Sequence, residues 1–533
     1  MSLLQISEAQ VTEDFPIVAD DLEVALFARD PLVRNPCAIT FDTKGRLCVG
    51  MGPQYRAPKP DTPPDSVWIV TDEDEDGTAD TRKEFATGFN AIQGLAWKGD
   101  WLWIANAPEL TRVRDTDGDD IADEYIRVYT DLGNLEHALH GLQFGPDGRL
   151  YMSKGNSKGL TILPDRIAPA PFRELWGIEV PGGTPEPKPK HFTAATYEKN
   201  YQDPRDDWGV TGGILRCNDD GTGLEIVSRG FRNPWDIAFD DQFNWLGTDN
   251  DQTMGDKLFA PFYGAHFGWG HNWSYDWKGD DHLPTAPSSG PLYEGSGAGI
   301  IFCDIPNYPD KYRNVFLYSD WLNREVRIFQ SKWDGAWQKA DRENLEILAH
   351  AGGGRSMPLS KGRAFDPVDI EMGPDGVIWI SSWGRQYGAH YEDEQLANEG
   401  RIYRIWPKGY QPVPVDSIPF DSDSNLIAAL GHHLPIWRTS AQEKLLQRGE
   451  EVLPTILQQL ASDDLTTAQE TWLVWTTRRI DPARTWMDRN TNQKIQSLRV
   501  QGFLKTDHSE LRPSLEDAEP RVRLATVLAI RES

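Results

Sequence analysis

The sequence predicts an all-β six-bladed β-propeller followed by a small all-α repeat domain. Two patterns carry this prediction: strand pairs joined by tight turns return along most of the chain, and apolar residues then change to helical spacing. A third observation is the length of 533 residues, which exceeds the roughly 250–300 residues at which one hydrophobic core stops growing. We expect an N-terminal tail over 1–18, the propeller over 19–410, a linker over 411–424 and the helical domain over 425–533.

The strand pairs define the expected blades. Clear copies cover 39–50, 95–105, 142–152, 237–248 and 370–380, and a looser copy consists of 315–319 with 325–329. The anchors of the six copies are Phe41, Trp97, Phe144, Phe239, Leu317 and Met372. Their shorter intervals fit the roughly 40–50 residues of a propeller blade, and the longer ones fit a blade with an insertion. The Gly-Pro-Asp-Gly copies are expected to be hairpin turns, since Gly supplies positive φ and Pro-Asp sets the bend.

The longest interval contains a Pro- and Gly-rich insertion, roughly Lys158 to Trp208. A loop of this length in a compact domain is typical of a lid or binding element. A surface loop without such a role would have the same composition, so the sequence leaves both readings open.

After the segment 404–409 the pattern becomes helical. A linker rich in Pro, Asp and Ser precedes apolar residues at helical spacing, namely Leu426, Leu430, Leu445, Leu446, Val452, Ile456, Leu457 and Leu460. Near the end, Pro520 enters the first turn of an amphipathic helix. Paired helices of this kind resemble HEAT-type repeats, which supply packing surfaces rather than chemistry. The final repeat has no polar capping helix, so we expect either a longer natural chain or an exposed edge.

The composition excludes several classes of partner. With 54 Lys+Arg against 82 Asp+Glu the net charge is −28, which disfavours nucleic acid and anionic membranes and favours cations or neutral substrates. No apolar run reaches the roughly 18–20 residues of a transmembrane segment. The four cysteines form no CxxC pair, which disfavours a zinc ribbon, a dithiol centre and a haem-attachment site and leaves one disulfide open. The N-terminus has no signal-peptide pattern, as in a mature chain whose leader has been removed.

Two acidic loops share one spacing that suits calcium. In each loop, acidic residues stand at positions 1, 3, 5 and 9, and position 7 offers a backbone carbonyl. The expected ligands are Asp72, Asp74, Asp76, Thr78 and Asp80 in the first loop, and Asp115, Asp117, Asp119, Ile121 and Asp123 in the second. Calcium takes six to eight oxygen ligands, which alternating aspartates in a tight turn supply. Neither loop has the EF-hand glutamate at position 12, and solvated acidic turns are the alternative.

Candidate catalytic residues precede the innermost strands of the expected blades. His137 and His140 stand at the entry of one such strand, where a histidine at the channel mouth would be a general base. Arg232 stands at the equivalent entry of a later blade and directs a cation towards the same axis, while Asp249 to Gln252, Asp320 and Asp369 occupy related positions. The structural alternative for either histidine is a hydrogen bond to a carbonyl of a neighbouring blade, and for Arg232 it is a pair with an acidic neighbour. The dense aromatic segment 269–277 would either stack on sugars or pack within the blades.

Four motifs resemble the soluble quinoprotein sugar dehydrogenases. They are the segment that begins at His137 and ends in Leu-Gln-Phe-Gly-Pro-Asp-Gly-Arg-Leu-Tyr, Gly-Phe-Arg-Asn-Pro-Trp at 230–235, Gly-Ala-His-Phe-Gly-Trp at 264–269, and Gly-Arg-Ile-Tyr-Arg-Ile at 400–405. The glucose, aldose and sorbosone dehydrogenases of this group are six-bladed propellers that use pyrroloquinoline quinone (PQQ) and calcium. The whole chain is similar to proteins of Planctomycetes and Verrucomicrobia named as membrane-bound dehydrogenases, which carry C-terminal HEAT repeats and often a c-type haem segment.

The resemblance implies roles for individual residues. His137 matches the base that takes the proton from the sugar C1 hydroxyl, Arg232 matches the arginine that polarises the quinone, and the segment from Asp249 matches the one near the cofactor's calcium. The implied cofactor-binding positions are His140, Asn233, Gln93 and Asp369. The chain departs from the family at 365–369, where two quinone-binding arginines are expected and Phe-Asp-Pro-Val-Asp stands instead. A carboxylate there would repel the carboxylates of PQQ.

The leading expectation is therefore oxidation of a sugar or related alcohol, with PQQ and calcium as expected cofactors and electrons passing to a c-type cytochrome. By resemblance the protein would be periplasmic or secreted. Two alternatives remain open: a calcium-stabilised propeller that binds glycans or proteins without catalysis, and a lactonase-like hydrolase.

Overall fold

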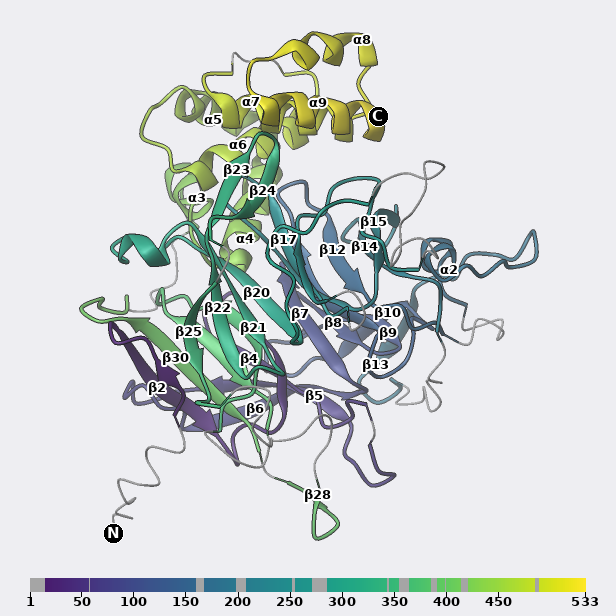
Figure 1. Cartoon of the computed structure of the whole chain (residues 1–533), viewed down its shortest axis with the longest axis vertical. Helices are drawn as coiled ribbons and strands as arrows, with labels where there is room; N and C mark the ends of the chain where they lie inside the picture. Colours follow the sequence, from purple (N-terminus) through teal and green to yellow (C-terminus); the bar gives the residue numbers. More distant parts are fainter. Residues whose placement is uncertain are drawn as a thin grey trace.

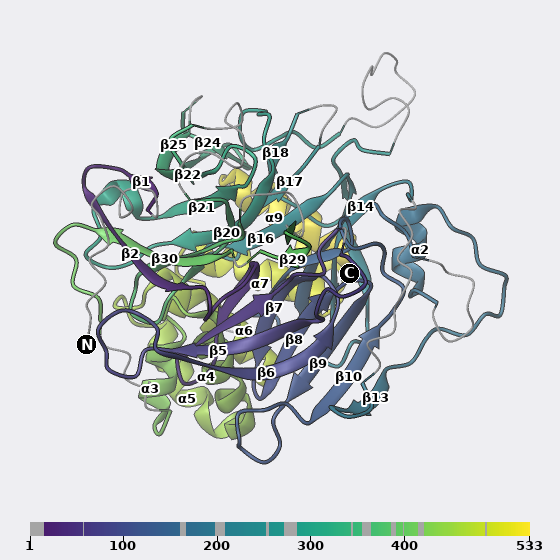
Figure 2. The ribbon, with the colours of Figure 1, turned by 90° about the horizontal axis from the view of Figure 1, so that it is seen from below.

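The computed structural model describes most of the chain. The described residues are 15–56, 58–159, 167–197, 208–251, 255–270, 285–342, 345–353, 364–384, 391–397, 399–413, 420–484 and 488–533. Six β-sheets surround one axis and a group of helices lies at one end of it (Figures 1 and 2).

The first three blades follow one another along the chain. Blade 1 consists of β3 (Pro36–Phe41), β4 (Leu47–Met51), β5 (Asp65–Thr71) and β6 (Thr81–Phe89). Blade 2 consists of β7 (Ile92–Lys98), β8 (Trp101–Asn106), β9 (Glu109–Arg114), β10 (Glu124–Tyr129) and β13 (Lys190–Thr193). Blade 3 consists of β11 (Leu139–Phe144), β12 (Leu150–Lys154), β14 (Gly212–Cys217), β15 (Glu225–Phe231) and the short β19 (Ala265–His266).

The last three blades use both ends of the propeller sequence. Blade 4 consists of β16 (Pro234–Phe239), β17 (Trp245–Asp249) and β18 (Lys257–Phe259). Blade 5 consists of β20 (Gly297–Cys303), β21 (Val315–Asp320), β22 (Glu325–Phe329), β25 (Glu346–His350) and the N-terminal β1 (Ile17–Val18). Blade 6 consists of β26 (Pro367–Met372), β27 (Ile378–Ser382), β30 (Arg401–Pro407) and β2 (Leu22–Arg29). The hairpins β23–β24 (Ser331–Asp334, Trp337–Ala340) and β28–β29 (Tyr391–Glu392, Gln395–Leu396) project from these sheets.

The inner strands close a ring. β3, β7, β11, β16, β20 and β26 each contact the inner strand of the next blade, and β26 returns to β3. Blade 6 joins the two ends of the propeller, because N-terminal β2 pairs with β30. The predicted six-bladed propeller is confirmed by this ring and by the strand pairing.

In one predicted blade, the strand expected to be the innermost is the second strand of the sheet. The copy at 315–319 and 325–329 forms β21 and β22, which are the second and third strands of blade 5. The inner strand is β20, and Phe302 pairs with Phe316 across the two strands. β20 ends at Cys303 and β21 begins only at Val315, with a short 3₁₀ helix (Asp310–Tyr312) between them, so the tight turn that marks the other inner strands is missing there.

Two aspartates connect neighbouring blades around the axis. Asp236 on β16 accepts a hydrogen bond from the backbone N–H of Ile300 at 3.1 Å, and Asp369 on β26 accepts one from Ile39 N–H at 2.7 Å. In the preceding blade the Asp236 carboxylate faces Gly141, and the Asp369 carboxylate faces Gly299, where any Cβ would clash with it. Burial raises the pKa of Asp369 to about 7.

The insertion between β12 and β14 extends to the neighbouring blade. It contains α2 (Ala170–Trp176) and β13, which pairs with β10 as the outermost strand of blade 2. Tyr197 anchors it further, since its hydroxyl donates to Glu109 at 2.8 Å inside that blade. The described part of the insertion is therefore built into the propeller.

The C-terminal region is helical, as predicted. Its helices are α3 (Asp423–Ala429), α4 (Pro435–Arg448), α5 (Leu453–Leu460), α6 (Thr467–Ile480), α7 (Thr491–Phe503), α8 (His508–Leu511) and α9 (Pro520–Glu532). Thr466 and Gln469 form a capping box before α6, and Pro520 is the first residue of α9. A HEAT-type arrangement of these helices stays a prediction.

The helical domain packs against the turns that join the first and second strands of the blades, and we call this end of the propeller the turn face (Figure 1). Side chains of the helical domain donate to backbone carbonyls in four of these turns: Trp437 to Thr43, Gln442 to Pro146, Arg499 to Gln242 and His433, between α3 and α4, to Gly373. In Figure 2 the helices lie behind the strands, and the opposite end, which we call the mouth face, is towards the viewer.

Candidate functional site

His137 lies on the mouth face, just before β11, and its backbone is held on several sides. Its N–H donates to Asn134 Oδ1 at 2.8 Å, and its carbonyl accepts from Lys154 Nζ at 2.8 Å and from Ser157 Oγ at 2.6 Å. Lys154 also donates to the carbonyls of Gly155 and Ser157, so one buried ammonium ties the His137 segment to the end of β12. His137 is 2% exposed.

The His137 imidazole is oriented as a base. Nδ1 lies 2.8 Å from Asn156 Oδ1, which only accepts hydrogen bonds, so this contact is made by the tautomer with the proton on Nδ1. Nε2 then carries the lone pair and lies 3.8 Å from Glu136 Oε1. Burial, and next the positive charge of Arg232, hold the pKa of His137 well below its usual value. The ring of Trp208 covers the imidazole edge-on at 4.8 Å between centroids. His137 is therefore neutral at pH 7, with one nitrogen able to accept a proton.

A row of rings crosses the mouth from blade 3 to blade 6. His140 stacks on Trp235 at 4.4 Å, Trp235 contacts Tyr55 at 6.2 Å, and Tyr55 contacts Trp383 at 5.4 Å. His140 Nε2 also lies 2.7 Å from Asn233 Oδ1, which fixes the contact between blades 3 and 4. Burial lowers the pKa of His140 to about 3, so this ring is neutral too.

Some buried polar atoms near the mouth lack a partner among the described residues. Gln93 is 3% exposed and donates to the carbonyl of Leu135 at 3.0 Å, but its Oε1 accepts no hydrogen bond. The indole N–H of Trp383 and Nδ1 of His140 are likewise unpaired. Since buried polar groups in proteins are almost always satisfied, these atoms indicate a place for a hydrogen-bonding ligand.

Arg232 and Asn233 are positioned by blade 4. Arg232 Nη1 donates to the carbonyl of Asn250 at 3.1 Å, and the N–H of Asn233 donates to Asp249 Oδ1 at 2.9 Å. Asp249 is fully buried, and burial raises its pKa to about 6 although the Lys257 ammonium opposes this change. The structure thus gathers His137, His140, Arg232, Asn233 and Asp249 at the meeting point of blades 3 and 4.

The segment before β26 carries an ion pair of its own. Arg324 of blade 5 lies 2.7 Å from Asp366, and both side chains are 1% exposed. A cavity of about 240 Å³ adjoins this pair, and its lining includes Asp366, Ser382, Glu399 and Arg401. Asp369 lies further along β26, in the contact to β3 described above.

These residues do not fit PQQ, which carries three carboxylates. Around the mouth, Asp249, Asp251, Asp366 and Glu399 contribute negative charge. Three of the cations nearby are already engaged: Arg324 pairs with Asp366, Lys257 pairs with Asp251 at 3.0 Å, and Lys154 is bound by carbonyls. Arg232 and Arg401, which donate to backbone carbonyls, are also present. A tricarboxylate here would bring three negative charges against buried carboxylates, and these two arginines are too few to match them.

The outer acidic loops fit calcium better. Carboxylate oxygens of Asp72, Asp74 and Asp80 lie within 4.8 Å of one another, and those of Asp115, Asp117 and Asp123 do the same. In the first loop, repulsion from Asp80 and then Asp76 raises the pKa of Asp74. Asp76 and Asp119, at position 5, accept from the backbone N–H of Thr78 and Ile121 and so shape the two turns. Positions 1, 3 and 9 are thus the residues that would hold the ion, with carbonyls and water completing its shell.

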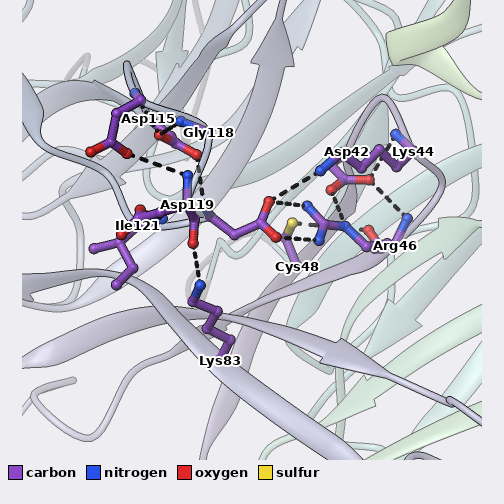
Figure 3. Close-up of polar contacts among 11 residues, drawn as sticks. Asp42, Lys44, Arg46, Cys48, Lys83, Asp115, Gly118, Asp119 and Ile121 are labelled. Carbon is purple, nitrogen blue, oxygen red and sulfur yellow. Dashed lines mark hydrogen bonds and ion pairs between the residues drawn. The ribbon is translucent and has the colours of Figure 1, made fainter.

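Both loops join the third and fourth strands of their blades, so they occupy equivalent places in blades 1 and 2. Figure 3 shows the second loop beside the turn of blade 1 that contains Asp42, Lys44 and Arg46. Arg46 binds Asp120 through two nitrogens, at 2.9 and 2.8 Å, and the hydrogen bond from Arg46 is the main reason that the pKa of Asp120 is lowered. The loop is therefore attached to the neighbouring blade.

Sequence reasoning missed Lys154, Asn156, Trp208 and Lys257. The available signal was a lysine at the end of one blade strand, Leu150–Lys154, and at the start of another, Lys257–Phe259, where most of the other strand residues are apolar. Gln252 and most of the aromatic segment 269–277 lie outside the described residues. All four cysteines are buried free thiols, so the disulfide left open by the sequence is not formed.

None of the described helices has the length and hydropathy needed to cross a lipid bilayer. No curated protein matches the chain.

Similar solved structures include the PQQ-bound aldose sugar dehydrogenase of Streptomyces coelicolor, with 15% identity, a TM-score of 0.46 and coverage of 73% of this chain and 99% of that one. The soluble aldose sugar dehydrogenase of Escherichia coli in its apo-form has 14% identity, a TM-score of 0.39 and coverage of 73% and 100%. A calcium structure of the Trichoderma reesei carbohydrate-active enzyme family AA12 has 13% identity, a TM-score of 0.48 and coverage of 74% and 98%. The fold assignment rests on the strand pairing, and these likenesses carry nothing about the reaction.

The family profile covers most of the propeller. It matches residues 11–168 and 191–409, which lie on either side of part of the insertion between β12 and β14. The chain belongs to the family described as "Domain of unknown function (DUF7133)".

Proposed function

We propose that the mouth face acts on a neutral sugar or related alcohol, with His137 as the general base. The observation that carries this proposal is the fixed tautomer of His137, whose Nδ1 binds Asn156 and whose Nε2 keeps its lone pair. A base needs an unprotonated nitrogen at the working pH, and the lowered pKa of His137 provides it.

A neutral polyol suits the polar groups of the mouth. Its hydroxyls would donate to the unpaired Oε1 of Gln93 and accept from the indole N–H of Trp383. The row from Trp235 to Trp383 offers ring faces for its C–H groups, and the carboxylates at the cavity beside Asp366 accept from hydroxyls. A sugar places no anionic charge against Asp249 or Asp366.

Oxidation is the leading reaction in this proposal. The substrate hydroxyl gives its proton to His137 Nε2, and the adjacent carbon gives up a hydride, that is, two electrons and a proton, to a two-electron acceptor of the quinone class. With the proton from His137 this acceptor is reduced to the quinol. PQQ was the acceptor expected from the sequence, and the solved sugar dehydrogenases named above include a PQQ-bound form. Because the mouth does not fit the carboxylates of PQQ, PQQ takes no part in the proposed step. A c-type cytochrome as final acceptor and a periplasmic or secreted location belong to the same proposal.

Hydrolysis of a sugar lactone is the second candidate. The poor fit of the mouth to PQQ favours it, because hydrolysis needs no redox acceptor. In that reaction His137 takes a proton from water, the resulting hydroxide attacks the lactone carbonyl, and the ring C–O bond breaks as the leaving oxygen takes the proton from His137. The Arg232 guanidinium, which is close enough to lower the pKa of His137, would stabilise negative charge on the carbonyl oxygen.

The deciding experiment compares both reactions on one preparation. The purified chain, loaded with calcium, is tested for dye reduction with aldoses and alcohols, with and without PQQ, and for acid release from sugar lactones. We expect turnover in one assay and a loss of at least about 100-fold in His137→Gln, with His191→Gln on exposed β13 unchanged. Unchanged turnover in His137→Gln would contradict the base assignment. Sugar binding without turnover in either assay would instead indicate a binding propeller.

A further inference from the structure

The cluster of carboxylates in blade 4 contains a cation that belongs to the chain. Lys257 is the first residue of β18 and stands opposite Asp249, the last residue of β17, in the strand register. Its Nζ lies 3.0 Å from Asp251 Oδ2, 3.6 Å from Asp249 Oδ2 and 3.4 Å from the carbonyl of Phe267. The Lys257 side chain is 7% exposed, and both aspartates are fully buried.

This ammonium occupies the place that a metal ion would need. A calcium ion shared by Asp249 and Asp251 would require their oxygens at about 2.3–2.6 Å, together with further oxygen ligands. Those two oxygens and the Phe267 carbonyl already surround Nζ. A divalent ion beside the ammonium would be repelled in a site with little water to screen the two charges.

Other oxygens of the cluster accept hydrogen bonds from the backbone, whereas Asp249 Oδ2 has no hydrogen-bond partner among the described residues and faces Lys257 Nζ at 3.6 Å. Asp249 Oδ1 accepts from Asn233 N–H at 2.9 Å, and Asp256 accepts from the N–H groups of Asp251 at 2.8 Å and Gly295 at 3.0 Å. Lys257 is thus the countercharge that lets Asp249 hold the turn from Arg232 to Asn233. The buried lysine of blade 3 differs, since the partners of Lys154 at the mouth are three backbone carbonyls and burial lowers its pKa well below the usual value.

We propose that Lys257 is a built-in substitute for a metal ion, so that the Asp249–Asp251 pair of the mouth binds no calcium. Removing the ammonium converts this pair into a calcium site. The proposal disagrees with the calcium expected near Asp249 by resemblance, and it holds whichever reaction the mouth performs.

The test uses the full chain in which calcium binding by the two outer acidic loops is removed. The substitutions are Asp72→Asn, Asp74→Asn, Asp115→Asn and Asp117→Asn. With Lys257 intact, isothermal titration with calcium is expected to show no binding, and millimolar calcium is expected to leave the melting temperature unchanged. Adding Lys257→Ala is expected to create one calcium site and a calcium-dependent rise in melting temperature. Adding Asp249→Asn to that variant is expected to remove the site.

Either arm can overturn the proposal. Calcium binding at one site in the lysine-intact chain, lost in Asp249→Asn, would show that a metal resides there despite Lys257. A folded Lys257→Ala chain that binds no calcium would show that the ammonium does not occupy a metal site. If Lys257→Ala folds only with calcium, the proposal is supported, and if it does not fold at all, the lysine-intact arm decides.

Discussion

The two ends of the propeller differ in what their loops are used for. On the turn face, short regular turns such as Gly-Pro-Asp-Gly at 145–148 present backbone carbonyls, and the helical domain binds these carbonyls. On the mouth face, irregular segments before the inner strands gather His137, Arg232 and Asp249 with two buried lysines. Regular turns repeat from blade to blade and suit packing, whereas chemistry requires different side chains in each blade.

The largest expected effect tests the turn face. Arg499 on α7 is partly buried and donates to Gln242 and Phe243 carbonyls at 2.7 and 2.9 Å and to Asn244 Oδ1 at 2.8 Å. We expect Arg499→Met to lower the free energy of unfolding by about 2–3 kcal/mol, because these acceptors lose their donor. Calorimetry measures the effect.

Arg523→Met is the matched control, since Arg523 donates only to carbonyls of the helical domain, those of Asp517 and Ala518. Equal destabilisation by both substitutions would argue that the inter-domain contact contributes nothing particular.

The acidic loops provide the next test. If they bind calcium, a free calcium concentration of a hundred times the dissociation constant raises the free energy of unfolding by about 2.7 kcal/mol per site. We expect Asp72→Asn with Asp115→Asn to abolish the calcium-dependent rise in melting temperature. Asp220→Asn, in the equivalent turn of blade 3, should leave it intact. A rise that persists in the double variant would place the ion elsewhere.

The domain contact should also weaken in acid. Burial lowers the pKa of His433 to about 4, while its ring donates to the Gly373 carbonyl at 2.7 Å. Below about pH 6.5 His433 is protonated in the unfolded chain but stays neutral in the folded chain. The free energy of unfolding therefore falls as the pH drops from 6.5 to 4. We expect His433→Gln to reduce this loss by on the order of 1 kcal/mol in melting experiments at several pH values. A pH profile identical to that of the unsubstituted chain would contradict this role.

The smallest expected effect concerns the role of Trp208 on the mouth face. The Trp208 ring contacts His137 and is 45% exposed, so its removal should cost little stability. We expect Trp208→Ala to raise KM several-fold, through loss of a ring that packs against substrate, with kcat changed less. An unaltered KM would indicate that Trp208 only shields the histidine.

The sequence allowed much of the architecture to be predicted, because strand alternation and turn residues are local signals. Five inner strands were found this way, and the sixth was displaced because a long connection with a 3₁₀ helix, rather than a tight turn, joins Cys303 to Val315. The entry positions of His137 and Arg232 were also predictable from the repeat. The partners of Lys257 and Lys154 were not, because a buried lysine is explained only by carboxylates or carbonyls that folding brings to it.

The most direct test measures turnover per folded molecule and melting temperature together for His137→Gln and Arg499→Met. The account predicts that His137→Gln loses at least about 100-fold in turnover with little change in melting temperature. It predicts the reverse for Arg499→Met, a lower melting temperature with turnover retained. Loss of turnover in Arg499→Met at temperatures where it is folded, or full activity in His137→Gln, would contradict the separation of chemistry and packing between the two faces.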